Sequence, residues 1–319
     1  MSKILPEKIT IGVSACLLGR EVRFDGGHKR SRFITDMLAE HFSFTGFCPE
    51  VAIGMGTPRQ PIRLVGDASK PAAVGVKTPE LDVTQPLRDY GKKVAADISE
   101  LCGFIFKKDS ASCGMERVKV YNDKGMAERS GTGLFAREIM KAHPLLPVEE
   151  EGRLNDAVLR DNFITRVYVF ARWKQLTGSG LSKSGLVKFH ARHKLLLMSH
   201  STVKYRELGQ LLSDLTREPL SDVADRYIAG LMQALRLPAT RKRHTNVLQH
   251  LLGYLKNNLD SAYRVDLDNT IDAYRRGEFP LVVPVRLLQH HFSMHPHAYI
   301  NEQVYLNPHP QALLIRNNV

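Results

Sequence analysis

The sequence lacks any long apolar run. No stretch of its 319 residues approaches the ~20 apolar residues that a membrane-spanning helix needs, which excludes an integral membrane protein. Hydrophobic residues make up 43% of the chain and charged residues 24%, enough to fill hydrophobic cores and to coat them. A chain of this length and composition is expected to form two domains.

Cysteine is also scarce. The four cysteines lie far apart and form no Cys-x-x-Cys pair, which excludes a disulfide framework and argues against a paired zinc site. We therefore expect a reducing, cytoplasmic location. Residues 13–16, ending at Cys16, resemble a lipoprotein cleavage site. The apolar stretch before that cysteine begins only at Ile9, shorter than the ~7–15 residues of a signal core, so we expect no lipid anchor.

Two long segments lack acidic residues, in a chain whose formal net charge is +12. The first runs between Asp161 and Glu207 and holds nine basic residues; the second runs from Arg226 to Leu259. A solvated helix face normally mixes both signs of charge. One-signed segments of this length favour a nucleic-acid partner over an ordinary solvated surface.

Strand-like and helix-like patterns alternate in the first half of the chain. Strands are expected at 9–17, 42–47, 102–107 and 117–121, and helices at 31–40, 84–101 and 132–143. Residues 58–79, rich in proline and glycine, are expected to form a loop with irregular strands. This order predicts an α/β domain at residues 1–152, with a mostly parallel sheet and helices on both of its faces.

The second half of the chain shows helical periodicity alone. Leucines share one helical face in two places, around Leu208 and around Leu248. The interpretation is a connecting helix and linker at 153–180, followed by an all-α domain at 181–319.

Three cysteines stand in loops that follow expected strands. Cys16 closes the first expected strand, Cys48 follows the second and Cys113 follows the third, and the carboxyl ends of parallel strands share one edge of a sheet. Thiolates that meet there suggest a metal site, and a 4Fe-4S cluster held by three cysteines leaves one iron open to a substrate. Buried structural cysteines remain the alternative. Cys102 lies inside an apolar strand and is expected to be a core residue.

Polar residues beside these cysteines are candidates for catalysis. Glu50 follows Cys48 by two positions, close enough to orient or deprotonate a water molecule. Ser110 and Ser112 precede Cys113 and are able to hold water or a developing anion, although such clusters also form turns and helix caps. We therefore expect catalytic roles for Glu50, Ser110 and Ser112. Arg59 and Lys107 are the candidate substrate-binding residues.

Together these segments resemble the 2-thiouracil desulfidase family. The resemblance covers the first half of the chain and rests on three separated motifs, which are Ser14-Ala15-Cys16-Leu17-Leu18-Gly19 with Val22 to Gly26, Cys48-Pro49-Glu50 with Pro58-Arg59, and Lys107 to Gly114. It implies an oxygen-sensitive 4Fe-4S cluster on Cys16, Cys48 and Cys113. It also implies that Glu50 and one serine of the 110–112 segment are catalytic partners.

The second half resembles another family, one of formerly unknown function. The resemblance rests on residues 189–194, 243–250 and 303–306. Chains that fuse the two families look like tRNA 4-thiouridine desulfidases, which implies tRNA as the partner and uridine as the product, with no obligate protein partner. The basic residues expected to contact RNA are Lys188, Arg192, Lys194, Arg241, Lys242 and Arg243.

Two alternatives stay open from the sequence. A small-molecule thiouracil desulfidase would need the cysteines but not the basic helices. A non-catalytic RNA-binding or structural metal protein would need the helices but not Glu50.

Overall fold

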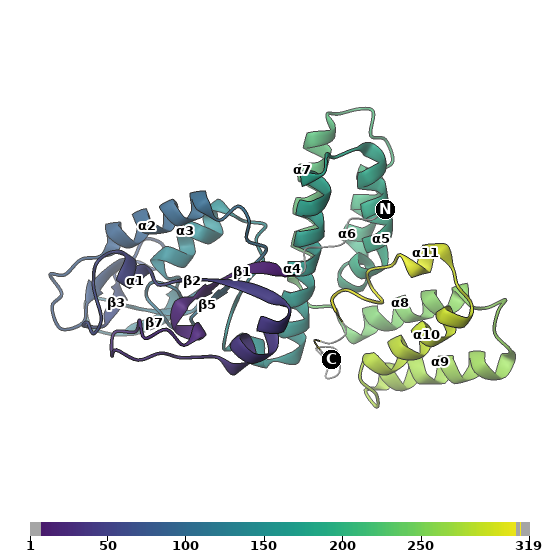
Figure 1. The fold of residues 1–319 in the computed structure, drawn as a ribbon, viewed down its shortest axis with the longest axis horizontal. Helices are drawn as coiled ribbons and strands as arrows, with labels where there is room; N and C mark the ends of the chain where they lie inside the picture. The colour runs from purple at the N-terminus through teal and green to yellow at the C-terminus, as the bar shows by residue number, and fades with distance from the viewer. Residues whose placement is uncertain (1–7, 311–312, 314–319) are drawn as a thin grey trace. The chain divides into compact units, whose positions relative to one another are not determined.

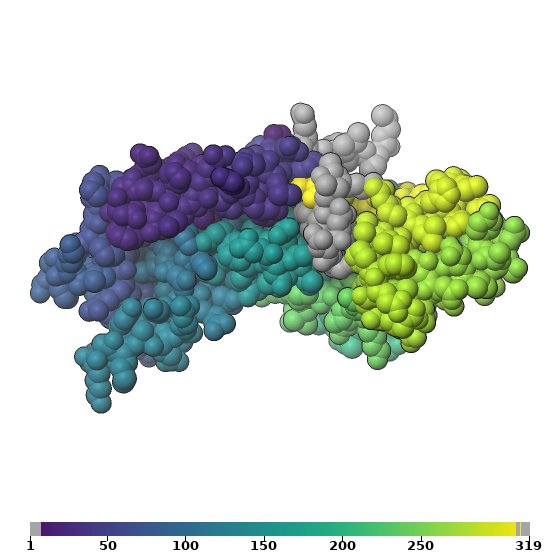
Figure 2. Space-filling model, turned by 90° about the horizontal axis from the view of Figure 1, so that it is seen from below, coloured from purple at the N-terminus to yellow at the C-terminus, as the bar shows by residue number. Residues whose placement is uncertain are grey.

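The computed structural model describes residues 8–310 and 313, and the chain divides into two compact units. The first unit ends at Asn155 and the second begins at Asp156. Figure 1 shows their elements in order along the chain, and Figure 2 shows one face of their surfaces. None of the helices in the described part of the chain combines the length and the apolar character that a bilayer crossing demands.

A four-stranded, wholly parallel sheet forms the centre of the first unit. Its strands lie in the order β2-β1-β5-β8. They are β1 (Ile9–Ser14), β2 (Phe42–Phe47), β5 (Phe104–Phe106) and β8 (Val148–Glu150). Gly12 pairs with Phe104, and its missing side chain leaves room for that ring, because a Cβ atom there would lie 2.4 Å from it. The expected α/β class is confirmed.

Two helices, α2 (Thr84–Asp97) and α3 (Leu134–Ala142), lie side by side against the first unit's sheets (Figure 1). Aromatic rings connect α3 to the central sheet. The ring of Phe135 lies 6.1 Å from that of Phe104 and 6.5 Å from that of Phe106, and all three side chains are fully buried. This aromatic packing anchors α3 to β5 of the central sheet.

A second, mixed sheet stands beside the first. It has the order β4-β3-β6-β7, and only β3 and β6 run parallel. Its strands are β3 (Ile62–Val65), β4 (Ala72–Gly75), β6 (Val118–Tyr121) and β7 (Ala127–Gly131). One face packs Leu64, Val118 and Val120 into a core with Leu87 of α2 and Leu134 of α3. The expected loop at 58–79 therefore supplies two regular strands of this sheet.

The helix expected at 31–40 takes a different form. The segment Phe33–Met37 is a π-helix, and Leu38–Glu40 continues as a 3-10 turn. Ile34 and Leu38 are nevertheless fully buried, as their spacing of four suggests. The expected strand at 9–17 ends at Ser14, because the chain turns into the 3-10 helix η1 (Ala15–Leu18). Cys16 consequently sits on a turn rather than in the sheet.

The second unit is helical throughout its described residues, which confirms the expected all-α class. Its helices are α4 (Ala157–Gly178), α5 (Lys183–His200), α6 (Thr202–Leu211), α7 (Leu220–Arg236), α8 (Arg241–Tyr254), α9 (Ser261–Arg276), α10 (Val282–Met294) and α11 (Ala298–Asn301). Asp156 caps α4 by accepting a hydrogen bond from the Leu159 amide at 2.9 Å. The long helix α4 packs against α7, so its contacts place it within the second unit.

Gly133 ties α3 to the loop that carries Cys113. A Cβ atom at Gly133 would lie 2.6 Å from the backbone of Ser112 and 2.7 Å from the Gly114 nitrogen. We predict that Gly133→Ala destabilises the protein by about 1–3 kcal/mol, because the added methyl group would clash with backbone atoms of the Cys113 loop. Thermal unfolding followed by circular dichroism measures the effect.

Gly178→Ala is the matched control for this substitution. Nothing lies within 4 Å of the added methyl group in the last turn of α4, so stability should hold or rise. An unchanged melting temperature for Gly133→Ala would contradict the close packing between α3 and the Cys113 loop.

Candidate functional site

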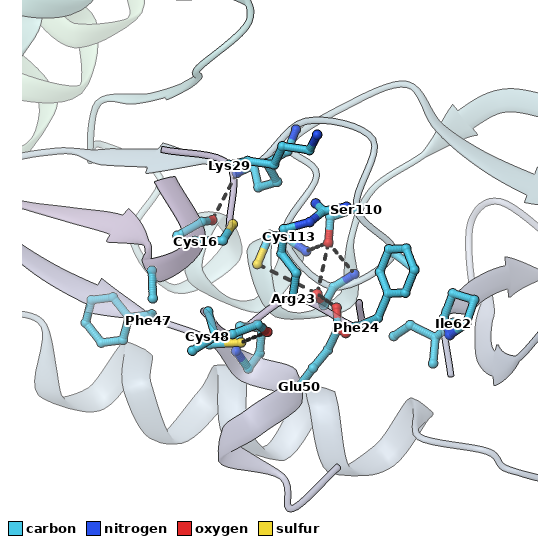
Figure 3. A pocket seen from close by; sticks show the side chains of 18 of the residues that line it. Cys16, Arg23, Phe24, Lys29, Phe47, Cys48, Glu50, Ile62, Ser110 and Cys113 are labelled. Carbon is cyan, nitrogen blue, oxygen red and sulfur yellow. Dashed lines mark hydrogen bonds between the residues drawn. The ribbon is translucent and has the colours of Figure 1, made fainter. Parts of the chain in front are cut away.

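A pocket of about 350 Å³ opens at the carboxyl edge of the parallel sheet. Residues that follow β1, β2 and β5 line it, which is where ligands bind in open parallel sheets. Figure 3 shows Cys16, Cys48 and Cys113 around this pocket, with Glu50 and Ser110 near them. The three cysteines expected to meet from separate strand ends therefore line one cavity.

Each cysteine is positioned by a different element. Cys16 lies on η1, Cys48 caps the short helix α1 (Pro49–Ala52), and Cys113 lies in the loop after β5. The first turn of α3 holds that last loop, because the amides of Leu134 and Phe135 donate to the carbonyls of Ala111 and Ser112 at 3.0 Å.

The fourth cysteine lies apart from these three. Cys102 is buried and does not line the pocket. Cys102 is therefore buried, as expected for a core residue.

Burial makes the three thiols costly to ionise without a cation. It raises the pKa of Cys16 to about 11 and also raises the pKa values of Cys48 and Cys113. Neighbouring thiolates add to this effect: Cys48 raises the pKa of Cys16, and Cys16 raises that of Cys113. Metal ions supply the positive charge that such a set needs, and a coordinating thiol is deprotonated outright.

The thiols do not share a single-ion site. Among the described residues, no group of three or more His, Cys, Asp or Glu side chains is arranged to hold one metal ion. A mononuclear site would bring its sulfurs to within about 2.3 Å of a common centre. Three thiols that line one cavity are instead the donor set typical of an iron–sulfur cluster, which cysteine thiolates hold.

Glu50 forms the polar centre of the pocket wall. Its Oε2 accepts a hydrogen bond from Arg59 Nε at 2.8 Å, and the Arg59 Nη2 atom lies 2.7 Å away. Its Oε1 accepts a hydrogen bond from Ser112 Oγ at 2.7 Å. The arginine thus fixes one carboxylate oxygen, and the other meets the serine beside Cys113.

The two candidate serines occupy different positions. Ser110 Oγ accepts hydrogen bonds from the backbone amides of Ser112 at 3.3 Å and Cys113 at 3.1 Å. It lies 3.0 Å from Ser112 Oγ but has no direct bond to Glu50. The geometry therefore makes Ser112 the partner of the carboxylate and Ser110 the residue that shapes the turn.

The two candidate substrate-binding residues line the pocket, but each is paired within the protein. The Arg59 side chain is only 5% exposed, and its guanidinium also donates to the carbonyls of Val22 at 2.9 Å and Gly56 at 2.8 Å. Lys107 Nζ pairs with Glu151 Oε1 at 2.5 Å. Arg59 is thus placed to orient Glu50, and its role as a substrate clamp stays a prediction.

Ser14 also lines the pocket, although the sequence analysis predicted no role for it. Its Oγ accepts a hydrogen bond from the Lys107 amide at 2.9 Å, and its hydroxyl offsets part of the rise that burial causes in the pKa of Cys113. It therefore joins the ends of β1 and β5 beside one of the thiols. Its position as the last residue of β1, two places before Cys16, was the available signal.

The six basic residues expected to contact RNA lie in the second unit. Lys188, Arg192 and Lys194 are on α5, and the other three form the first turn of α8. Three of them are engaged with the protein. Arg192 pairs with Glu302 at 3.1 Å, Arg241 donates to the Tyr274 carbonyl at 2.8 Å, and Lys194 Nζ lies 5.6 Å from the centre of the Tyr205 ring. Lys188 and Lys242 are exposed.

Comparison with known families separates the same two regions of the chain. Residues 11–151 match the family described as 2-thiouracil desulfurase, and residues 194–310 match a family described as a protein of unknown function, DUF1722. A solved structure of a protein named "[4Fe-4S]-dependent thiouracil desulfidase TudS" has 32% identity and covers 47% of this chain and 94% of its own, with a TM-score of 0.37.

Two curated bacterial proteins are similar over about half of the chain. Uncharacterized protein YbgA of Escherichia coli (strain K12) is 33% identical over 159 residues, which are 50% of this chain and 94% of that protein. Uncharacterized protein YbbK of Bacillus subtilis (strain 168) is 30% identical over 151 residues, which are 45% of this chain and 97% of that protein. The chain therefore belongs to the 2-thiouracil desulfurase family through residues 11–151 and carries a DUF1722 region at residues 194–310.

Proposed function

We propose that this protein is a desulfidase that converts 4-thiouridine in tRNA to uridine and releases sulfide. The observation that carries the proposal is the shared pocket, in which three cysteine thiols and the Glu50–Ser112 pair line one cavity. Residues 11–151 match a family described as 2-thiouracil desulfurase. That name denotes the removal of sulfur from a thiolated pyrimidine and so supports the same chemistry.

The cofactor in this proposal is a 4Fe-4S cluster held by Cys16, Cys48 and Cys113. The pocket fits it, because three thiols line one cavity and are largely buried there, where a metal cluster would supply the positive charge that their ionised form needs. When bound through three cysteines, such a cluster supplies an iron with an open position that acts as a Lewis acid toward sulfur. The similar protein TudS is described as dependent on this type of cluster.

The protein's own residues supply the proton chemistry. Glu50 is the general base, and its Oε1 is the oxygen that faces Ser112 while Arg59 holds Oε2. Ser112 positions the attacking water beside that carboxylate. The water oxygen adds to the carbon that bears sulfur, the carbon–sulfur bond breaks, and sulfur leaves as hydrogen sulfide. One C=S bond and one water become one C=O bond and H2S, so no electrons need to be supplied.

Charge in the second unit supports a tRNA substrate. Arg241, Lys242 and Arg243 occupy the first turn of α8, where the positive end of the helix dipole disfavours cations. A phosphate group bound there would relieve that repulsion, because helix N-termini and basic side chains both attract it. The first unit alone would suffice for a free base, so the basic helices favour a polyanionic substrate.

A free thiolated pyrimidine is the second candidate substrate. The matching family is described by 2-thiouracil itself, and TudS is named as a thiouracil desulfidase. A pocket of about 350 Å³ is large enough for a small ligand. The two substrates share the proposed chemistry and differ only in whether the second unit contributes to binding.

The cysteines give the first prediction for this function. Protein prepared without oxygen should carry iron and sulfide with the broad visible absorption of an iron–sulfur cluster. Cys48→Ala should lose both the absorption and the metal, because two thiols hold a cluster poorly. Cys102→Ala is the matched control and should keep both, since Cys102 lies outside the pocket. Equal iron content in the two variants would refute the assignment of the ligands.

Glu50 and Arg59 give the second prediction. Glu50→Gln should lower kcat by about 10²-fold or more while leaving the iron content unchanged, because the base is lost but the cysteines are not. Arg59→Met should lower kcat less, since it only releases the carboxylate, but it should destabilise the fold by about 3 kcal/mol by leaving Glu50 without its partner. Single-turnover kinetics and thermal unfolding measure the two effects.

The double variant Glu50→Gln/Arg59→Met tests the coupling between these residues. It should recover part of the stability lost in Arg59→Met, because the unpaired charge is removed. Glu80→Gln, on an exposed loop of the same unit, is the control for kinetics. Additive losses of stability would show that the pair is not coupled.

The substrate prediction is tested by nucleoside analysis. Incubation of tRNA with the cluster-containing protein should convert 4-thiouridine to uridine and release an equal amount of sulfide. Conversion of free 2-thiouracil or 4-thiouracil without any change in tRNA would favour the second candidate. Unchanged 4-thiouridine and unchanged free bases, with the cluster intact, would refute the desulfidase proposal.

A further inference from the structure

Three cations lie in one row across the second sheet of the first unit. Lys119 on β6 pairs directly with Arg129 on β7. Arg63 on β3 immediately precedes Leu64, which pairs with Val120, so it lies beside Lys119 in the same row. The side chains alternate with the buried Leu64, Val118 and Val120, which places the cations on the face opposite the hydrophobic core.

This row is unfavourable for the isolated protein. Like charges directly opposite each other on neighbouring strands destabilise a sheet. Asp109 offsets one of them, because its Oδ1 lies 3.0 Å from Arg129 Nη1, but both side chains of this pair are about half exposed. Two cations therefore remain without a facing carboxylate among the described residues that line this part of the surface.

The row lies in a hollow rather than on a flat surface. A cavity of about 370 Å³ is lined by Arg63, Lys119, Tyr121, Arg129 and Asp109. Val118 and Lys119 of β6 pair with Gly131 and Arg129, so the register shift leaves Ser130 as an extra residue in β7, and such a bulge redirects side chains. The repulsion and the cavity together describe a site for an anion.

An aromatic ring stands beside the cations. The guanidinium carbon of Arg63 lies 5.2 Å from the centre of the Tyr121 ring, within range of a cation–π contact. The Nε atom of Arg63 is buried and has no hydrogen-bond partner in the part of the chain that the structure describes. A stacking platform with adjacent basic groups is the arrangement by which proteins hold single-stranded nucleic acid.

This cavity is a neighbour of the cysteine pocket. Ile62, Asp109 and Ala111 line both hollows, and all of these residues belong to the first unit. The loop between β5 and β6 contributes to both cavities, because its Asp109 and Ala111 line both and its Cys113 lines the cysteine pocket. A base in the cysteine pocket would therefore leave its neighbouring nucleotide beside the cationic row.

We infer that the Arg63–Lys119–Arg129 row with Tyr121 is a subsite for the nucleotide that flanks the thiolated base. The three cations bind its phosphodiester groups, and Tyr121 stacks on its base. The inference rests on the proposed desulfidase function for the identity of the neighbouring base. It adds a polynucleotide contact to the first unit itself, independent of the basic helices of the second.

The test removes two exposed cations and measures RNA binding. Lys119→Gln/Arg129→Gln in the full chain is titrated with a short single-stranded RNA that contains one 4-thiouridine, and anisotropy is followed at several salt concentrations. Loss of two phosphate contacts should raise Kd about tenfold and reduce the slope of log Kd against log salt by about 1.4. The control Lys93→Gln/Lys141→Gln removes the same charge from exposed positions on α2 and α3 and should change neither.

Substitution of Tyr121 tests the stacking contact independently of the cations. Tyr121→Ala should raise Kd about tenfold through lost stacking, whereas Tyr121→Phe should bind as the wild type does. Turnover of free 4-thiouracil should stay within about twofold of wild type in Lys119→Gln/Arg129→Gln, because a free base carries no phosphate.

The outcomes separate this inference from the function on which it rests. A Kd and salt slope for Lys119→Gln/Arg129→Gln that match the control would overturn the subsite, even if tRNA is desulfurised normally. A wild-type protein that holds its cluster but desulfurises neither RNA nor free base would instead overturn the proposed function. In that case the RNA-binding difference between the two double variants still decides whether the cationic row contacts phosphates.

Discussion

The convergence of parallel strand ends is the constraint on which the pocket depends. In the sheet of the first unit, β1 lies between β2 and β5, and all three strands point their carboxyl ends at one edge. The chain must leave that edge in three separate loops, and each loop carries one cysteine into the cavity. Neither sequence proximity nor a short motif could bring these thiols together, because 65 positions separate Cys48 from Cys113. The sheet makes them neighbours, and the packing of Gly133 against the last loop keeps Cys113 in place.

The thiols and the carboxylate of the site lie in different electrostatic environments. The thiols are buried and costly to ionise by themselves, whereas Glu50 has a cation, Arg59, on its far side. A bound cluster would supply the positive charge that the ionised thiols need, while Arg59 supplies that of the carboxylate. Ser112 lies between these two environments, within hydrogen-bond distance of Glu50 and next to Cys113. The arrangement places a carboxylate, held by Arg59, beside the cavity that the three cysteines line.

Much of the fold was accessible from the sequence, and the exceptions have physical causes. Phe42 to Phe47 is a strand as expected, because its apolar pattern has no competing helical period. The segment at 58–79 was expected to be irregular because proline and glycine dominate it, yet tertiary pairing with β6 orders it into β3 and β4. The cysteines could be placed at one edge because strand polarity alone determines that edge. The sequence could not show whether Ser110 or Ser112 contacts Glu50. Two serines in one turn are told apart only by where the backbone of the turn points each side chain.

Basic charge gathers at two features of the structure, of which the sequence analysis singled out only the turn that opens α8 and not the row on the second sheet. The basic turn that opens α8 opposes the dipole of its own helix, and the Arg63–Lys119–Arg129 row opposes itself across adjacent strands. Some of these cations have contacts within the protein, since Arg241 donates to the Tyr274 carbonyl and Arg63 lies against the Tyr121 ring, but the buried apolar residues that form the cores are different ones. Polar surface of mixed sign would have stabilised each unit more. A phosphate group bound at either feature would offset the repulsion at that feature, because helix N-termini and rows of cations both attract anions.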